Sequence, residues 1–238
     1  MAATSRYFAL AFRLVSMGLI VTGLLRLTGV FLPGGGMAWS AFVYYTTQSN
    51  VLCLIWMGVM AGVTVRDLVR SGPKGVSAPW PRLGAMVMMA ITITMLIYLV
   101  ILAPSAFVQG SDYRPFTLTD NLVHIITPCL VIADWFLFTP KGKLRLFDPV
   151  LWAIPPYLYL VFAFAWPFLG GSFSMGSRYP YPFMDVDVNG VDGVVISLAV
   201  LTVALIGFGY LYVGADKLLS RAQRKAAERK APAGPEPE

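Results

Sequence analysis

The chain has 238 residues, of which 57% are hydrophobic and only 13% are charged. Average chains carry about 25% charged residues, so this composition excludes an ordinary water-soluble domain, a collagen-like chain and a disordered chain, and it indicates a membrane protein with several spans. The net charge of +6 does not indicate nucleic-acid binding. Most Lys and Arg residues lie in a tail and in short segments between apolar runs, a distribution that the positive-inside rule of membrane proteins explains better.

Six apolar runs are long enough to cross a bilayer. A hydrocarbon core of about 30 Å needs about 20 helical residues at a rise of about 1.5 Å per residue. The runs cover residues 7–32, 38–65, 83–108, 116–138, 149–169 and 192–214. The first is too long for a cleavable signal peptide and contains two arginines, so we expect it to be retained. The sequence therefore predicts an all-α polytopic integral membrane protein with a six-span transmembrane domain over residues 1–216.

The Lys and Arg residues indicate how the spans are oriented. Of the 18 in the chain, only Arg114 and Arg178 fall in segments opposite the two termini, and two more lie inside the first span. Positive charge is retained on the cytoplasmic side, so we expect both termini in the cytoplasm and a multi-pass protein of the cell membrane. Residues 217–238 then form a basic, helix-prone cytoplasmic tail, and its Pro-, Gly- and Glu-rich end at 231–238 is expected to be disordered.

The motifs of soluble cofactor enzymes are absent from the sequence. No nucleotide-binding glycine pattern and no HExxH or GxSxG motif occurs, so we expect no cofactor. His124 is the only histidine, and Cys53 and Cys129 lie inside apolar runs. One imidazole without a thiolate or second imidazole nearby makes a poor zinc site, so no metal is expected either. Function must then depend on polar residues within the spans.

The second span contains five consecutive polar residues, Thr46, Thr47, Gln48, Ser49 and Asn50. Five such residues cannot all face lipid. Thr47 lies about 13 Å below the predicted outer end of the span at the helical rise. Asn50 follows three residues later and shares a helix face with Thr47. We therefore expect both side chains to point into the bundle.

The fourth span carries a second polar stripe, formed by Thr117, Asp120, Asn121 and His124. Spacings of three and four residues place them on one helix face. His124 lies about 12 Å deep by the same rise, at the depth of Thr47. Pro128 cannot donate to the carbonyl of His124, which predicts a kink there. A hydrated pocket near the outer leaflet would accommodate both polar groups.

A structural interpretation of these residues stays open. Ser, Thr and Asn in membrane helices often form interhelical hydrogen bonds worth about 0.6 kcal/mol each, and a single histidine can do the same. Pro128 can be a purely structural kink, and Asp120 can be a solvated residue near the outer interface. Spacing alone does not decide between this interpretation and a reactive site.

Three short motifs, taken in their order along six spans, resemble the androgen-induced protein family and the bacterial six-span proteins related to it. The motifs are a Thr with a polar residue three positions later (Thr47, Asn50), Asn-x-x-His with a later Pro (Asn121, His124, Pro128), and Tyr-Pro-Tyr-Pro-Phe at 179–183. The resemblance covers residues 7–214. Animal members are intramembrane hydrolases of fatty acid esters of hydroxy fatty acids, with a threonine nucleophile and a histidine. The resemblance implies those roles for Thr47 and His124; Asn50 lies where the animal enzymes have an acidic residue.

The chemistry of a Thr–His pair is consistent with these roles. A threonine hydroxyl needs an adjacent base to act as a nucleophile, and the pKa of histidine lies nearest neutrality. The amides of Gln48, Asn50 and Asn121 could orient His124 or donate to an oxyanion. Asp120 shares the stripe of His124 and is the candidate third member.

Two arginines inside the first span need partners, because a guanidinium in hydrocarbon is expensive. Arg26 lies about 9 Å deep, and its planar fork suits a carboxylate. We expect it either to bind the acidic head of a fatty-acid-like ligand or to pair with Asp120 or Asp112 or extend to the headgroups. Arg13 lies at the depth of Asp134, so it either pairs with Asp134 or extends to the headgroups.

The loop at 170–191 contains the Tyr-Pro-Tyr-Pro-Phe run. Alternating prolines stiffen the backbone, so this loop either caps the outer mouth of the pocket or belongs to an interfacial aromatic belt. The function that the sequence favours is a lipid ester hydrolase that acts on a membrane lipid through Thr47 and His124. The alternative is a non-enzymatic protein that binds or transports a lipid or small molecule.

Overall fold

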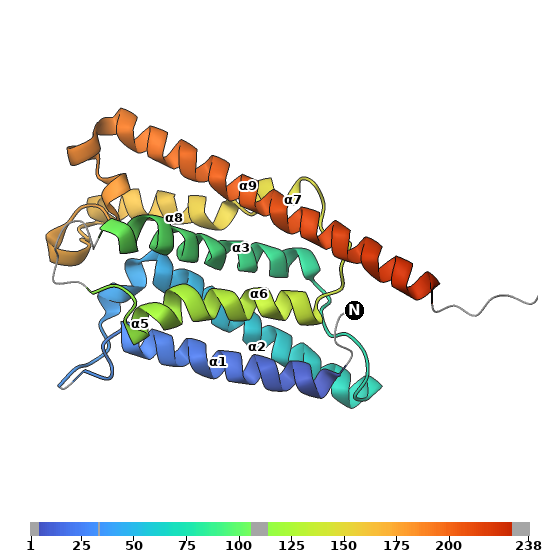
Figure 1. The fold of residues 1–238 in the computed structure, drawn as a ribbon. Coiled ribbons are helices and arrows are strands. Elements are labelled where there is room, and N and C mark those ends of the chain that lie inside the picture. The colour runs from blue at the N-terminus through green and yellow to red at the C-terminus, as the bar shows by residue number, and fades with distance from the viewer. Residues whose placement is uncertain (1–4, 33, 106–113, 230–238) are drawn as a thin grey trace, which may run out of the picture.

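The structure is a computed structural model that describes residues 5–32, 34–105 and 114–229. The described chain is helical apart from its connections, and Figure 1 shows the helices running side by side. The helices are α1 (Arg6–Leu27), α2 (Tyr45–Ser71), α3 (Pro81–Ile97), α5 (Leu118–Asp120), α6 (Thr127–Phe138), α7 (Asp148–Leu151), α8 (Ile154–Ala165) and α9 (Val186–Glu228). Two π-helical segments, Tyr98–Leu102 after α3 and Asn121–Ile126 before α6, join these helices into longer rods.

Six of these rods are long and apolar enough to cross a membrane. They cover Arg6–Leu27, Tyr45–Ser71, Pro81–Ser105, Leu118–Phe138, Asp148–Leu169 and Val186–Glu228. Within the described residues no strand is present. The prediction of an all-α polytopic membrane protein with six transmembrane helices is therefore confirmed.

The second and sixth spans differ from their predicted limits. Residues 39–43 form a short 3-10 turn, and α2 begins only at Tyr45. The last helix begins at Val186, where the side chain of Asp185 accepts hydrogen bonds from the amides of Asp187 and Val188. Gly190, with φ of 68°, bends its first turn, a conformation that residues with a Cβ rarely adopt. Apolar counting missed both limits because caps and turns, not hydrophobicity, determine where a helix begins.

The basic segment after residue 216 is part of α9. After the kink at Gly190 this helix continues to Glu228, so residues 217–228 of the basic segment are helical and continuous with the sixth span. The expectation of disorder at 231–238 lies outside the described residues. Figure 1 shows α9 projecting beyond the other helices at the end where the N-terminus also lies. We call this end, which carries Arg70, Lys74 and Lys143, the basic end.

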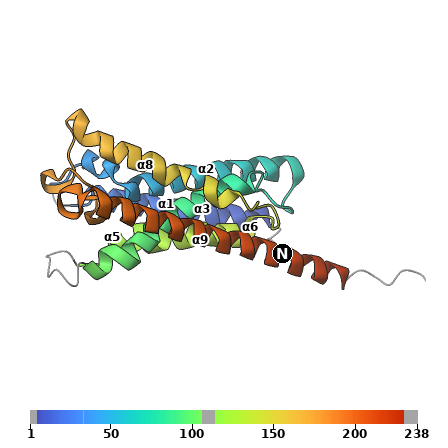
Figure 2. The same ribbon diagram turned by 90° about the horizontal axis from the view of Figure 1, so that it is seen from above.

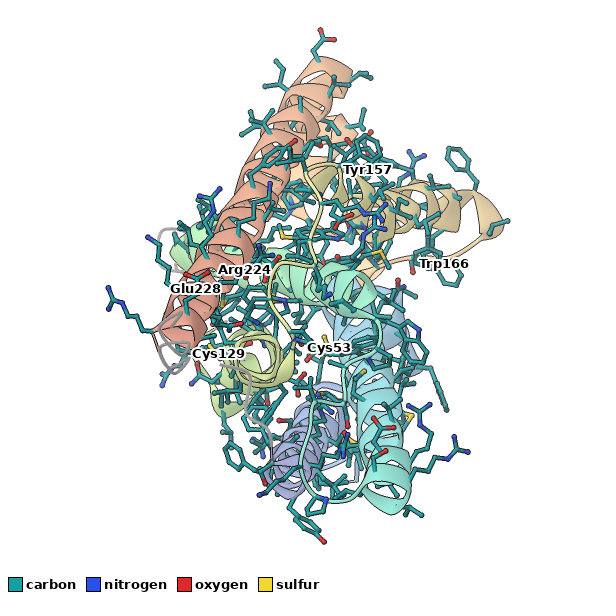
Figure 3. All side chains as sticks on the ribbon, turned by 90° about the vertical axis from the view of Figure 1, so that its right-hand side faces the viewer. Cys53, Cys129, Tyr157, Trp166, Arg224 and Glu228 are labelled. Carbon is teal, nitrogen blue, oxygen red and sulfur yellow. The ribbon has the colours of Figure 1, made fainter. Side chains whose placement is uncertain are left out.

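The helices form two groups. Contacts join α1 to α2, α2 to α3, α3 to α6 and α6 back to α1, which gives a four-helix arrangement. Figure 1 shows α8 and α9 on the side of α3, away from α1, and Figure 2, seen from above, shows α9 crossing over the other helices. Figure 3, viewed from the basic end, shows Tyr157 of α8 beside α9, where its hydroxyl lies 2.7 Å from that of Thr202. The molecule is therefore a four-helix core with a two-helix layer on one side.

A buried ion pair joins α1 to α6 in the half of the bundle toward the basic end. Arg13 is fully buried, and its Nε lies 2.7 Å from Oδ1 of Asp134. The guanidinium also donates to Oγ1 of Thr64 at 2.6 Å and to the backbone oxygens of Met60 and Ser77 at 3.2 Å. Of the two expectations for Arg13, pairing with Asp134 is confirmed, because four acceptors on three segments satisfy the guanidinium inside the bundle.

The loop between α6 and α7 is fixed at the basic end by two charged side chains. Lys141 donates to the backbone oxygen of Trp135 at 2.5 Å and lies 3.7 Å from the centre of its ring. Burial lowers the pKa of Lys141 to about 8, although neighbouring carboxylates oppose this shift. Asp216 of α9 accepts a hydrogen bond from the amide of Leu144 at 3.0 Å. The hydrogen bond therefore holds α9 to the loop that follows α6.

The predicted orientation can be measured by cysteine labelling. We expect a membrane-impermeant thiol reagent, added to intact cells, to label cysteines placed at Gly36 and Arg178, because these exposed positions lie at the end opposite the basic end. Cysteines at Ser71 and Lys143, which are also exposed, should be labelled only after the membrane is permeabilised. Labelling at Lys143 in intact cells would reverse the orientation.

Candidate active site

Two π-helical segments meet at the histidine. His124 lies in the segment Asn121–Ile126, and Tyr98 begins the segment that follows α3. Their rings are stacked, with centroids 4.2 Å apart and an interplanar angle of 7°. Tyr98 is fully buried and His124 is 7% exposed. π-helical turns are rare and are frequently found at functional sites. Two of them at one place make this region the candidate functional site.

The π-helical segment that carries His124 ends just before Thr127 and Pro128. The Thr127 hydroxyl donates to the backbone oxygen of Leu122 at 2.9 Å, five residues back. A proline at the second position of α6 lacks the N–H that a regular α-helix needs, and the chain accommodates it with a π-helical segment. α1 packs closely on this segment at Gly23, where an added Cβ would lie only 3.1 Å from side-chain atoms of Leu122 and Val123.

The hydroxyl that lies beside His124 belongs to Thr46. Its Oγ1 is 3.4 Å from Nε2 of His124. Thr47 is 1% exposed, and its hydroxyl donates to the backbone oxygen of Ala41 at 2.6 Å. The predicted pairing of Thr47 with His124 is corrected accordingly: adjacent helical residues point about 100° apart, so α2 turns Thr46 toward the histidine and Thr47 toward the preceding 3-10 turn.

Asp120 lies on the other side of the imidazole. Its Oδ1 is 3.9 Å from Nδ1 of His124, longer than a hydrogen bond. Its Oδ2 accepts from the hydroxyl and amide of Thr117 at 2.7 and 3.2 Å, which caps the helix and fixes the carboxylate. Asp120 is 7% exposed, so the alternative of a solvated interfacial residue is wrong. The structure thus brings a hydroxyl, an imidazole and a carboxylate into one row.

Asn50 holds the two sides of this row together. Its Nδ2 donates to the backbone oxygen of Thr46 at 2.8 Å and to that of Val123 at 3.1 Å, the residue before His124. Within the described part of the chain, Oδ1 of Asn50 and Nδ1 of His124 are buried without a hydrogen-bond partner. An unsatisfied buried polar atom costs about 1–3 kcal/mol, and these two atoms remain free to bond a further group.

The other predicted supporting residues do not lie against the imidazole. Gln48 donates to the backbone oxygen of Phe42 at 3.1 Å, and Asn121 donates to that of Phe116 at 3.0 Å. Arg26 is exposed, and its Nε donates to the hydroxyl of Thr119 at 3.3 Å. Both amides therefore bond to the segments that precede their helices. Arg26 lines no described cavity and forms no ion pair with Asp120. Its alternative partner, Asp112, lies outside the described residues.

The loop with the Tyr-Pro-Tyr-Pro-Phe run folds against the bundle. Tyr181 is stacked on Phe183, with ring centroids 5.5 Å apart. Burial raises the pKa of Tyr181 to about 12, and hydrogen bonding to the side chain and backbone of Thr46 opposes this shift. Both rings, with Met184, line an apolar cavity. The loop therefore packs on the bundle next to the start of α2, with the ring of Tyr181 6.4 Å from that of Tyr44, as expected of a cap; the alternative of an interfacial aromatic belt stays open.

Sequence reasoning missed two aromatic residues of this region. Tyr98 lies inside an apolar run and gave no signal of its own. Tyr181 was seen only as part of a proline-rich loop, and its approach to Thr46 depends on how that loop folds back. Thr46 was visible as a member of the polar cluster in the second span, but its helix phase relative to Thr47 was not.

These features define a class: a polytopic membrane protein of six helices with a hydroxyl, an imidazole and a carboxylate in a row near one end of the bundle. Comparisons with protein-family models, with curated proteins and with solved structures give no match to this chain.

Proposed function

We propose that the chain is an intramembrane lipid ester hydrolase with Thr46 as the nucleophile and His124 as the base. The observation that supports this most is the row of Thr46, His124 and Asp120, in which Nε2 lies 3.4 Å from the hydroxyl and Nδ1 lies 3.9 Å from the carboxylate. Both distances are longer than those of an assembled catalytic site, and such contacts are often looser before substrate binds.

The proposed reaction has two steps. Nε2 of His124 takes the proton of the Thr46 hydroxyl as Oγ1 attacks the ester carbonyl, and the protonated imidazole then gives that proton to the departing alkoxide. This leaves an acyl-threonine and a free alcohol. Water, deprotonated by His124, then attacks the acyl-threonine. The imidazolium gives the proton to Oγ1 of Thr46 as its bond to the acyl carbon breaks, which releases a carboxylic acid and restores the hydroxyl. Asp120 stabilises the imidazolium that forms in each step.

The stacked ring of Tyr98 and the clamp of Asn50 support the same proposal. A base must hold one orientation through proton transfer, and a ring stacked at 4.2 Å restricts how the imidazole can tilt. The ring of Tyr181 lies 6.4 Å from that of Tyr44, two residues before Thr46, and we propose that its hydroxyl donates to the oxyanion that forms at Thr46. The amides that the sequence offers as oxyanion donors, those of Gln48, Asn50 and Asn121, instead donate to backbone oxygens.

The substrate class follows from the surroundings. A site inside a six-helix membrane bundle is reached most directly by a lipid, and the resemblance to the androgen-induced protein family adds fatty acid esters of hydroxy fatty acids as the class to test first. We propose that the protein lies in the cell membrane, with the basic end of the bundle on the cytoplasmic side. The reaction needs water at the acyl-threonine stage, which fits a site near one end of the bundle.

A second candidate function is non-enzymatic binding or transport of a lipid or small molecule. The observation that favours it is the apolar cavity between α3, α8 and α9, since binding requires a cavity but no nucleophile. A binder does not depend on His124 for turnover because it has none.

Turnover by the purified protein tests the proposed function. We expect slow release of free fatty acid from a long-chain ester of a hydroxy fatty acid, and a loss of at least about a hundredfold in kcat on His124→Ala, since general-base catalysis contributes about 10²–10⁴-fold. His124→Ala should unfold at nearly the wild-type temperature. A strongly destabilised variant with unchanged kinetics would support the purely structural interpretation of the histidine.

A further inference from the structure

A cavity of about 240 Å³ lies between α3 with its π-helical extension, α8 and α9. Its accessible lining is almost wholly apolar, and no Asp, Glu, Lys, Arg or His lines it. Along α9 the lining residues extend from Leu198 to Phe208, which is about 15 Å at the helical rise. The cavity is therefore a slot without charge that runs parallel to the helices.

One side of this slot opens toward lipid. Val100 and Tyr157 both line the cavity and are 69% and 45% exposed on the surface of the bundle. The opposite wall is deep, since Tyr45 and Leu205 are less than 9% exposed. A surface of exposed apolar side chains on membrane-spanning helices faces the hydrocarbon core. A molecule that enters the slot through this side therefore comes from the bilayer.

The slot reaches the capping loop and the first residue of α2. Tyr181 and Met184 of the capping loop line it, as does Tyr45, which precedes Thr46 in the chain. The ring of Tyr181 also lies 6.4 Å from that of Tyr44, the residue before α2. Thr46 itself does not line the slot, so a chain that fills it has one end near the start of α2, the helix that carries Thr46.

We propose that this cavity binds the unbranched hydrocarbon chain of a bilayer lipid, with an uncharged end of that chain at Tyr181. An ionised carboxylate at the same position would be buried without a cation, which is costly, and the exposed Arg26 does not line the cavity. The position of an ester at this end rests on the proposed function, whereas binding of the chain requires no reaction.

The energetic basis of this binding is packing and not the hydrophobic effect. Lipid tails are as apolar as the walls of the slot, so transfer from the bilayer releases no apolar surface from water. The gain comes from dispersion contacts that the walls make with the chain. Such contacts are sensitive to shape, so the slot should select an unbranched chain and respond strongly to a bulky side chain placed in it.

A photoreactive alcohol tests the chain site in the full-length protein. The probe is hexadecanol with a diazirine on its terminal methyl end, applied to the protein in nanodiscs and mapped by peptide sequencing. We expect adducts on residues 93–101 and 198–208, with competition by unlabelled hexadecanol and weaker competition by hexadecanoate. Equal competition by the acid and the alcohol, or adducts spread evenly over the lipid-facing surface, would overturn the proposal.

Two tryptophan variants provide the matched pair. Leu201→Trp adds bulk to the wall of the slot, whereas Val203→Trp adds it two residues away at a position that is 72% exposed and does not line the slot. We expect Leu201→Trp to lower labelling of residues 93–101 by at least about fivefold and Val203→Trp to leave it unchanged. Ala204→Leu, a smaller addition to the same wall, should give a partial loss if Leu201→Trp does not fold.

The outcomes separate this site from the proposed reaction. Labelling that Leu201→Trp removes, in a protein that shows no ester hydrolysis, would support the chain site and reject the hydrolase. Hydrolysis that continues in Leu201→Trp at the wild-type rate for long-chain esters would reject the chain site and leave the hydrolase intact.

Discussion

Thr46→Ala is expected to abolish ester hydrolysis, with a loss of at least about a thousandfold in kcat. Residues that act as one catalytic unit lose most of the activity when any one of them is removed, and the hydroxyl 3.4 Å from His124 is that of Thr46. The double variant with His124→Ala should be little worse than either single variant for the same reason. Single-turnover kinetics on a long-chain ester measures the effect on the chemical step.

The neighbouring threonine provides the control for this prediction. Thr47→Ala removes a hydroxyl that is bonded to Ala41 at 2.6 Å, so it should lower stability by about 1 kcal/mol and leave kcat within about tenfold. Thr46→Ser keeps the hydroxyl and should retain activity. If Thr47→Ala abolishes turnover and Thr46→Ala does not, the nucleophile is Thr47, as the resemblance implies.

Asp134→Ala should be the most destabilising single substitution in the half of the bundle toward the basic end. It leaves Arg13, which is 0% exposed, as a buried charge without its carboxylate, and breaking such a pair on one side costs about 3–5 kcal/mol. Replacing both residues, Arg13→Met with Asp134→Leu, should cost less than Asp134→Ala alone because no charge is then left unpaired. Unfolding in mixed micelles with increasing SDS measures these differences.

A surface pair serves as the comparison for Asp134. Arg66 and Asp67 form an ion pair at 2.8 Å, but the Arg66 side chain is 49% exposed. Exposed pairs contribute about 1 kcal/mol or less, so Asp67→Ala should change stability far less than Asp134→Ala. Equal effects of the two substitutions would show that the buried guanidinium does not depend on Asp134.

The fold could be predicted because its dominant constraint is visible in the sequence. A span needs a long apolar helix, since lipid satisfies no backbone hydrogen bond, and six such runs were countable. What could not be predicted is the start of α2 at Tyr45 and the start of α9 at Val186. A 3-10 turn and a helix cap both lie outside what an apolar count can measure.

The site could be predicted only to the level of its elements. The polar stripe with Asp120 and His124 and the polar cluster with Thr46 and Asn50 were both identified from spacing, and the structure brings these stripes together. The choice between Thr46 and Thr47 could not be made, because it depends on the phase of one helix against another. A π-helical segment adds to this difficulty, since it changes the phase of the residues that follow it.

Arg26 illustrates a different limit. Depth alone suggested a buried carboxylate receptor, but the side chain lies on the exposed side of α1 and bonds Thr119. Arg13, on the same helix, is fully buried and paired. The two arginines differ in helix face and not in composition, and the sequence does not state which face meets the bundle.

The most direct test of an activated hydroxyl at position 46 is covalent labelling. Purified protein is treated with a long-chain fluorophosphonate, and the adduct is mapped by fragmentation that separates Thr46 from Thr47. We predict a single adduct on Thr46 in the wild-type chain and none in His124→Ala, because the hydroxyl is unreactive without its base. An adduct on Thr47, an adduct that persists without His124, or no adduct at all would contradict the account.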